Sequence, residues 1–169
     1  MIDTFGVVFA GNFDFGPAVL AGLVGGLAML AVVYMGRTMG MTRMDLLKTL
    51  GTMMPGVSGT MAYVVGLMAH LAMSAAFGLA HVGLLHAFAV TSTGDALLWG
   101  VAIGVAHGAV ILVAMPIVLD MMHPLVRSGE MVKPGKLMRG FGSMTPMGML
   151  AAHIVFGIIT GAVYAGIIG

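Results

Sequence analysis

The sequence contains no cysteine, and charged residues make up only 8% of its 169 residues. The lack of cysteine excludes disulfide bonds, thiolate metal sites and cysteine nucleophiles. A soluble domain usually has about 25% charged residues, so the low charge argues against a water-soluble enzyme. The formal net charge is only +1, which removes any electrostatic basis for nucleic-acid binding, since that needs a face with many phosphate-contacting side chains.

Hydrophobic residues, by contrast, make up 60% of the chain, and the mean hydropathy is +1.10. Four apolar stretches are each long enough for a transmembrane helix, which needs about 20 apolar residues. These stretches cover residues 17–36, 59–80, 96–119 and 147–168. Residues 81–95 begin apolar and end polar, so they either extend the second span or lie at the membrane interface. We therefore predict an all-α membrane protein, with residues 1–169 forming one integral membrane domain built as a bundle of four transmembrane helices.

All seven basic residues lie in two loops, one after the first span and one after the third. The positive-inside rule then places both loops in the cytoplasm and both chain ends outside. The first 16 residues contain no Lys or Arg. We therefore do not expect them to be a signal peptide, which has a basic start.

The two halves of the chain resemble each other. The first basic loop ends in Gly51-Thr52-Met53-Met54-Pro55 and the second in Gly142-Ser143-Met144-Thr145-Pro146. In the spans that follow, His70 precedes Gly78 by eight residues, and His153 precedes Gly161 by the same number. These matches predict two similar helical hairpins in parallel repeat, related by an axis along the membrane normal. Chance similarity between spans rich in glycine and alanine would give the same pattern.

Each span also contains small residues four positions apart, which allow helix backbones to approach closely in lipid. His70, His107 and His153 each lie three or four positions from a member of such a row, so each shares the face of that row on a helix. The three histidines are therefore expected to face the bundle interior. A helical rise of about 1.5 Å per residue puts His70 and His107 near the midplane. His153 then lies closer to the cytoplasm, with Met29 roughly opposite.

Ionisable side chains at this depth are costly, which makes the three histidines candidates for a functional site. In one interpretation they are neutral hydrogen-bond partners between helices. In a second, His70 facing His107 or His153 holds haem b, with the neighbouring glycines leaving room for the macrocycle. In a third, the histidines and Met29 hold Cu or Zn. A proton or substrate path is the fourth.

Other polar residues give less specific signals. His81 and His86 are expected to be solvated at the interface, although together they would also suit an outer-surface site. Asp120 and His123, three positions apart, either form a pair or are simply polar residues at a helix end. The tyrosines near the span ends are expected to lie at the interface, as amphipathic rings do. They are Tyr34, Tyr63 and Tyr164.

Most of the 19 methionines lie in or beside the cytoplasmic half of this topology. Thioethers bind Cu(I), and Met41-x-x-Met44 and Met144-x-x-Met147-x-Met149 look like ligand clusters. We favour contact with an apolar partner or the membrane instead, because a cytoplasmic copper site without cysteine would compete with thiol-rich chaperones. Residues 39–50 are similar to a short amphipathic helix on the inner leaflet.

Two segments also carry a resemblance. Met41–Met53 reads Met-x-x-Met-Asp-x-x-x-x-Leu-Gly-Thr-Met, and His153–Tyr164 reads His-Ile-Val-Phe-Gly-x-x-x-Gly-x-x-Tyr. Together with the Gly-rich first span, they resemble small, Met-rich four-helix bacterial inner-membrane proteins of unknown function. The resemblance implies a bacterial cytoplasmic membrane and names no catalytic residue.

These observations lead to two functional expectations. The first is a non-enzymatic membrane subunit or ligand-binding module, associated with other membrane subunits or with itself as a homo-oligomer. Its cofactor or metal site would be at His70, His107 and His153. The alternative is a small oligomeric transporter or permeation module with its site at the repeat interface. An enzyme is not expected, because the spans contain no Asp, Glu, Lys or Arg.

Overall fold

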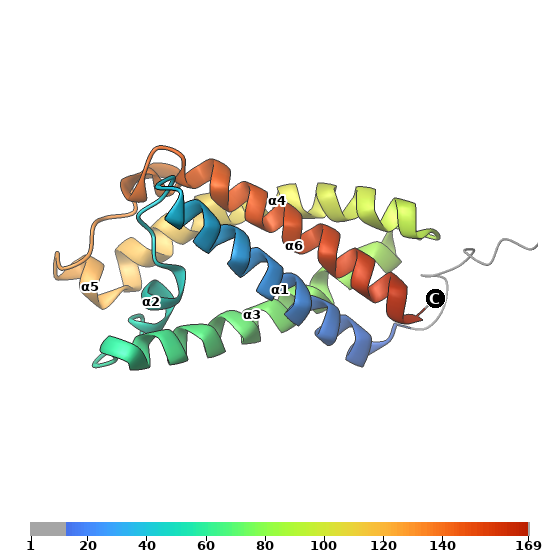
Figure 1. Cartoon of the computed structure of the whole chain (residues 1–169), viewed down its shortest axis with the longest axis horizontal. Helices are drawn as coiled ribbons and strands as arrows, with labels where there is room; N and C mark the ends of the chain where they lie inside the picture. Colours follow the sequence, from blue (N-terminus) through green and yellow to red (C-terminus); the bar gives the residue numbers. More distant parts are fainter. Residues whose placement is uncertain (1–12, 169) are drawn as a thin grey trace, which may run out of the picture.

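The computed structural model describes residues 13–168, which are mostly helical and contain no strand (Figure 1). The four long helices are α1 (Phe15–Thr38), α3 (Gly59–Ala87), α4 (Thr93–Met122) and α6 (Thr145–Ile168). Three short helices connect them, namely α2 (Leu46–Gly51), α5 (Pro124–Arg127) and the 3-10 helix η1 (Lys136–Phe141). The all-α four-helix bundle is thus confirmed. The segment for which we do not expect a signal peptide falls largely in residues 1–12, outside the described part of the chain.

Each of the four predicted spans corresponds to a helix of 24 to 30 residues, long and apolar enough to cross a membrane. The helices extend a few residues beyond the predicted boundaries. The largest difference is in α3, which continues to Ala87. Residues 81–87 therefore extend the second span, one of the two possibilities that the sequence left open.

Local sequence explains where several helices begin and end. Asp45 precedes α2, and its carboxylate accepts a hydrogen bond from the backbone N–H of Lys48. The hydroxyl of Ser92 accepts one from the N–H of Asp95 at the start of α4. Both are N-cap contacts, which satisfy backbone donors that a helix start leaves unpaired. Pro124 begins α5 after a single intervening residue, His123, at a first-turn position where its missing N–H costs nothing.

The long helices pack in the spatial order α3, α1, α6, α4, with α1 and α6 in the middle. Figure 1 shows α3 and α4 meeting near the turn that joins them and separating towards the other side of the molecule. At the joined end, the backbone N–H of Asp14 donates to the hydroxyl of Tyr164. We call this the terminal end of the bundle. At the opposite end, the N–H of Arg43 donates to the carbonyl of Phe141, so the two basic loops meet there. We call it the basic end.

Glycine rows bring the helix pairs into close contact, as the four-residue spacing predicts. A Cβ atom on Gly22 of α1 would lie 2.6 Å from the Cα of Gly78 in α3. A Cβ atom on Gly104 of α4 would lie 2.6 Å from the carbonyl oxygen of His153 in α6. Both positions therefore exclude any side chain, because the neighbouring atoms belong to the backbone of the other helix.

The α1–α3 and α4–α6 pairs have a further similarity. His70 of α3 lies beside Gly26 of α1, and His153 of α6 lies beside Gly104 of α4. A strict two-fold axis would relate α1 to α4 and α3 to α6, so α3 would pack on α4 as closely as α1 packs on α6. Instead, α3 and α4 make only a small contact. The two pairs are therefore similar while the whole bundle is asymmetric, and the internal repeat stays a prediction.

The helix expected over residues 39–50 is shorter than predicted, and its place on the inner leaflet stays a prediction. Only residues 46–51 of that segment are helical, and this helix, α2, packs against α3. Gly51 and Gly66 allow the contact, because a Cβ atom on either would overlap the backbone of the other helix. Leu46 and Thr49 are buried. One face of α2 therefore lies against protein.

Candidate ligand-binding pocket

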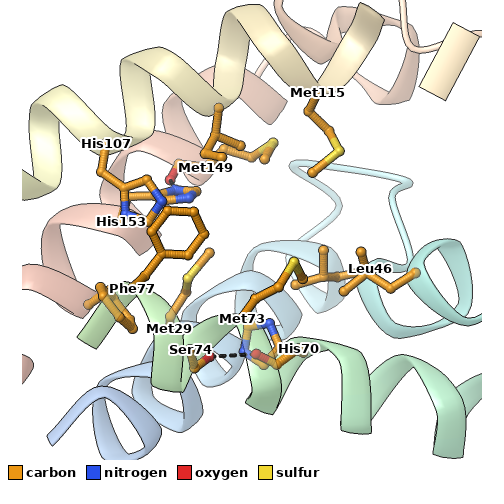
Figure 2. Close-up of a pocket in the computed structure, with 13 residues that line it drawn as sticks. Met29, Leu46, His70, Met73, Ser74, Phe77, His107, Met115, Met149 and His153 are labelled. Atoms are coloured by element: carbon orange, nitrogen blue, oxygen red, sulfur yellow. Dashed lines mark hydrogen bonds between the residues drawn. The ribbon is translucent and has the colours of Figure 1, made fainter. Parts of the chain in front are cut away.

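A pocket lies between α3 and α4 where these helices separate (Figure 2). Its empty volume is about 510 Å³ including its open mouth. All four predicted site residues line it, and α1, α2 and α6 complete the lining. The four are His70, His107, His153 and Met29. The sequence thus identified residues that share one pocket, one from each of the four long helices.

Methionine sulfur atoms are the most frequent polarisable groups in this lining. Met115 points into the pocket from α4, and Met29 and Met73 point into it from the opposite side, from α1 and α3 (Figure 2). Met149 of α6 also lines the pocket and is only 8% exposed. The pocket lining contains no carboxylate, lysine or arginine. Its chemistry is therefore that of thioethers, imidazoles and hydrocarbon.

Backbone carbonyls fix the tautomers of two histidines in the pocket. The Nδ1 atom of His153 lies 2.7 Å from the carbonyl oxygen of Met149. The Nε2 atom of His70 lies 3.0 Å from the carbonyl oxygen of Gly26. Because a carbonyl only accepts, each of these nitrogens must carry the hydrogen in a neutral ring. The second nitrogens, Nε2 of His153 and Nδ1 of His70, then have lone pairs, and neither has a hydrogen-bond partner among residues 13–168.

His107 has a different role. Its Nδ1 atom lies 3.2 Å from Nε2 of His81, so one ring donates a hydrogen bond to the other across α3 and α4. The His107 ring also contacts Phe77, with centroids 4.2 Å apart, and His153, with centroids 4.7 Å apart. Three imidazoles from α3, α4 and α6 therefore lie in a row. His81 is the member that the sequence interpretation missed.

The expectation that His81 is solvated at the interface is wrong, because the residue is only 3% exposed. It lies inside α3, which extends beyond the predicted end of the second span. Its position three residues after Gly78 was the available signal, since that spacing puts His81 on the packed face of the helix. His86 is half-buried and lies 3.0 Å from the hydroxyl of Tyr164, so the two histidines do not form a joint outer-surface site.

Haem ligation by the predicted pairs, His70 with His107 or His153, stays a prediction, but the glycines do not leave the open space suggested for it. The space beside Gly104 is filled by the backbone of α6. Nor do three or more His, Asp or Glu side chains come together as a metal-binding group anywhere in residues 13–168. This disfavours Zn, which is usually held by several nitrogen, oxygen or thiolate ligands. The remaining candidate ligand set combines imidazole nitrogens with thioether sulfurs, and this combination suits Cu(I).

A second polar cluster, which the sequence interpretation missed, lies around Asp45 at the basic end. Tyr34 and Tyr63 donate hydrogen bonds to its carboxylate at 2.7 and 2.8 Å, and Arg37 forms an ion pair with it at 2.7 Å. Burial alone would raise the pKa of Asp45, but these hydrogen bonds and the Arg37 charge lower it below its ordinary value of 3.8. The two tyrosines thus hold α1 and α3 to the start of α2, in addition to lying near span ends. The signal for Asp45 was its N-cap position before Leu46.

The remaining candidates separate in the structure. Asp120 is exposed, whereas His123 is fully buried. The Nε2 atom of His123 lies 3.0 Å from the carbonyl oxygen of Thr49 and 3.2 Å from the hydroxyl of Thr52. His123 therefore ties the end of α4 to α2 and does not pair with Asp120. Tyr164 lies near the end of α6, as expected, but its side chain is fully buried in the protein.

Comparisons of the chain with protein-family models, with curated proteins and with solved structures gave no match.

Proposed function

We propose that this protein is a non-enzymatic membrane protein that binds a soft monovalent metal ion, Cu(I), in the pocket between α3 and α4. One observation carries the proposal. His70 and His153 each donate their ring N–H to a backbone carbonyl and keep a lone pair, in a pocket lined by four methionines.

This arrangement matches what a metal-ligating histidine needs. Such a histidine usually donates its other ring nitrogen to a carbonyl or carboxylate, which fixes the ring and its tautomer. Thioethers such as those of Met29 and Met149 are soft ligands that select Cu(I) over harder ions. The pocket has no carboxylate to balance a divalent ion. A metal ion with a single positive charge therefore has the smallest electrostatic cost at this depth.

The topology proposed with this function follows from the basic loops. Since both loops lie at one end of the bundle, the positive-inside rule assigns that end to the cytoplasm and both chain ends to the outside. The membrane is the inner membrane of a bacterium. Exposed methionines at the basic end, such as Met39 and Met122, support contact with the bilayer, with other membrane subunits or with a second copy of the chain.

Competitive Cu(I) titration of the detergent-purified protein against a chromophoric chelator, with metal analysis, tests the proposal. We expect one Cu(I) per chain, with affinity reduced about ten-fold or more by His153→Leu or Met149→Leu. Met147→Leu is the matched control, because Met147 is two residues from Met149 but 56% exposed and outside the pocket. Absence of stoichiometric Cu(I), or equal affinity in all variants, would contradict the proposal.

One observation also favours the transporter alternative. The pocket lies between α3 of the first half of the chain and α4 and α6 of the second half, where a repeat transporter holds its substrate. Cu(I) flux in proteoliposomes separates the two functions. Flux that is lost in Met149→Leu and kept in Met147→Leu would indicate a transporter, whereas tight binding without flux would indicate a binding module.

A further inference from the structure

A second pocket opens at the basic end, where the two basic loops meet. Its empty volume is about 880 Å³ including its open mouth. Arg43 holds the loops together, since its backbone N–H donates to the carbonyl of Phe141 at 2.7 Å and its guanidinium donates to the carbonyl of Gly140 at 3.2 Å. Arg37 from α1 and Lys48 from α2 line the same pocket. Three cations from three segments therefore surround one opening.

Two carboxylates also line this pocket, but they leave positive charge unbalanced. Asp45 is engaged by Arg37 in the one ion pair found within residues 13–168, and by two tyrosine hydroxyls. Glu130 accepts a hydrogen bond from Ser128 at 2.8 Å. Neither Arg43 nor Lys48 forms an ion pair in the described part of the chain, and both are exposed. The pocket thus has one more cation than anion, and two of its cations have no acidic partner.

The pocket lies at the ends of candidate membrane spans, the level at which lipid headgroups are expected. Arg37 is in the last turn of α1, and Tyr63 is near the start of α3, so the pocket lies where two spans end. Basic pockets between transmembrane helices at this level bind the phosphate groups of anionic lipids. Guanidinium groups suit phosphate because they present several N–H donors in one plane.

We propose that this pocket binds a phosphate group, carried either by an anionic phospholipid or free in solution, through Arg43 and Lys48 with Arg37 at its edge. Arg43 supplies a planar set of donors, and Lys48 supplies a mobile ammonium group. Glu130 opposes the bound charge and limits the affinity. This site shares no lining residue with the metal pocket, so it does not depend on the proposed Cu(I) function.

Lipid binding to the full chain tests the proposal by native mass spectrometry in detergent, with phosphatidylglycerol and phosphatidylcholine as probes. We expect preferential binding of phosphatidylglycerol. Arg43→Gln and Lys48→Gln should each weaken it about five-fold, and the double variant roughly 25-fold. The matched controls Arg127→Gln and Lys133→Gln change exposed cations that do not line the pocket. They should leave phosphatidylglycerol binding within about two-fold of the unmodified chain.

Glu130→Gln distinguishes a real effect on the pocket from loss of binding through misfolding. Removing this carboxylate should strengthen phosphatidylglycerol binding, which a damaged protein would not show. Competition with inorganic phosphate then shows whether the bound phosphate group belongs to a lipid or is free in solution. Displacement of the lipid by millimolar phosphate, with the same dependence on Arg43 and Lys48, would identify free phosphate as a ligand. Retention of the lipid would identify the headgroup. The proposal fails if the two lipids bind equally, if the control variants lose as much binding as the pocket variants, or if neither probe binds.

Discussion

The Nε2 atom of His81 lies 3.2 Å from the Nδ1 atom of His107, in a hydrogen bond that joins α3 to α4 inside the membrane-spanning part of the bundle. The outer nitrogens of this pair, Nδ1 of His81 and Nε2 of His107, are buried without a partner among the described residues. A buried polar atom without a partner costs free energy. The net stabilisation by the pair is therefore smaller than its geometry alone suggests.

A double-mutant cycle on His81 and His107 should show this balance. His81→Leu and His107→Leu should each destabilise the bundle by about 1–3 kcal/mol, because each leaves the remaining ring without its only hydrogen bond. The double variant should cost less than the sum, with a coupling free energy of about 0.6–1.7 kcal/mol. Unfolding in mixed micelles measures these values. His70→Leu combined with His107→Leu is the control and should be additive, since these two side chains share no hydrogen bond.

Asp45 should make stability depend on pH in the acid range. Its pKa in the folded protein lies below 3.8, so the folded state binds fewer protons than the unfolded state and the stabilisation is complete above that value. It is lost as the pH falls below 3.8 towards the folded-state pKa. Asp45→Asn should cost about 1.5–3 kcal/mol at pH 7, because hydrogen bonds to a charged group are lost. The difference from the unmodified protein should shrink as the pH falls to 3.

Thermal midpoints in detergent between pH 7 and pH 3 measure this effect. Asp120→Asn is the matched control, because Asp120 is exposed and forms no ion pair within the described residues. That variant should unfold like the unmodified protein at every pH. A stability difference for Asp45→Asn that stays constant with pH would show that the carboxylate charge is not the cause.

Gly104→Ala should separate α4 from α6. The added methyl group would lie 2.6 Å from the carbonyl oxygen of His153 and 2.8 Å from the Cα of Ile154, and backbone atoms cannot move aside as a side chain can. We expect a loss of about 1–3 kcal/mol. Gly148→Ala in α6 is the control, since no atom lies within 4 Å of its added Cβ. Equal stability of the two variants in mixed-micelle unfolding would mean that the close contact is not required.

His123→Leu should release α2 from the end of α4. The imidazole contacts both the Thr49 carbonyl and the Thr52 hydroxyl, and its removal leaves these groups without that partner. We expect faster hydrogen exchange in residues 46–52 and a loss of about 1–3 kcal/mol. Thr52→Val removes one of the two imidazole contacts and the hydrogen bond from the Thr52 hydroxyl to the Lys48 carbonyl, but it keeps the contact of His123 with Thr49. Unchanged exchange in α2 after His123→Leu would show that packing against α3 alone holds this helix.

The fold was predictable because its main determinants are local in the sequence. Span length, apolar composition and the confinement of Lys and Arg to two loops are properties of short segments, and the bundle follows from them. The shared pocket of His70, His107, His153 and Met29 was predictable for a related reason, since spacing from a glycine row assigns a helix face. His81 was missed because the boundary of its helix was placed at Ala80, before the residue itself.

Other features depend on partners that the sequence does not reveal. Asp45 receives hydrogen bonds from Tyr34 and Tyr63, which belong to two different spans, and no spacing rule connects them. The haem interpretation assumed empty space beside the neighbouring glycines, whereas the space beside Gly104 is filled. A glycine has the same appearance in a sequence whether the space beside it is empty or filled by another backbone, so only the structure distinguishes these cases.

The central position of α6 has a consequence for biosynthesis. Of the four spans, α6 leaves the ribosome last, yet it packs against both α1 and α4. When the first three spans have entered the bilayer, α1 and α3 have each other, but α4 has only a small contact with α3. Until α6 is inserted, one side of α1 and one side of α4 therefore face lipid, and α6 then closes the bundle. The pocket between α3 and α4 is completed in the same step, because His153 and Met149 belong to α6.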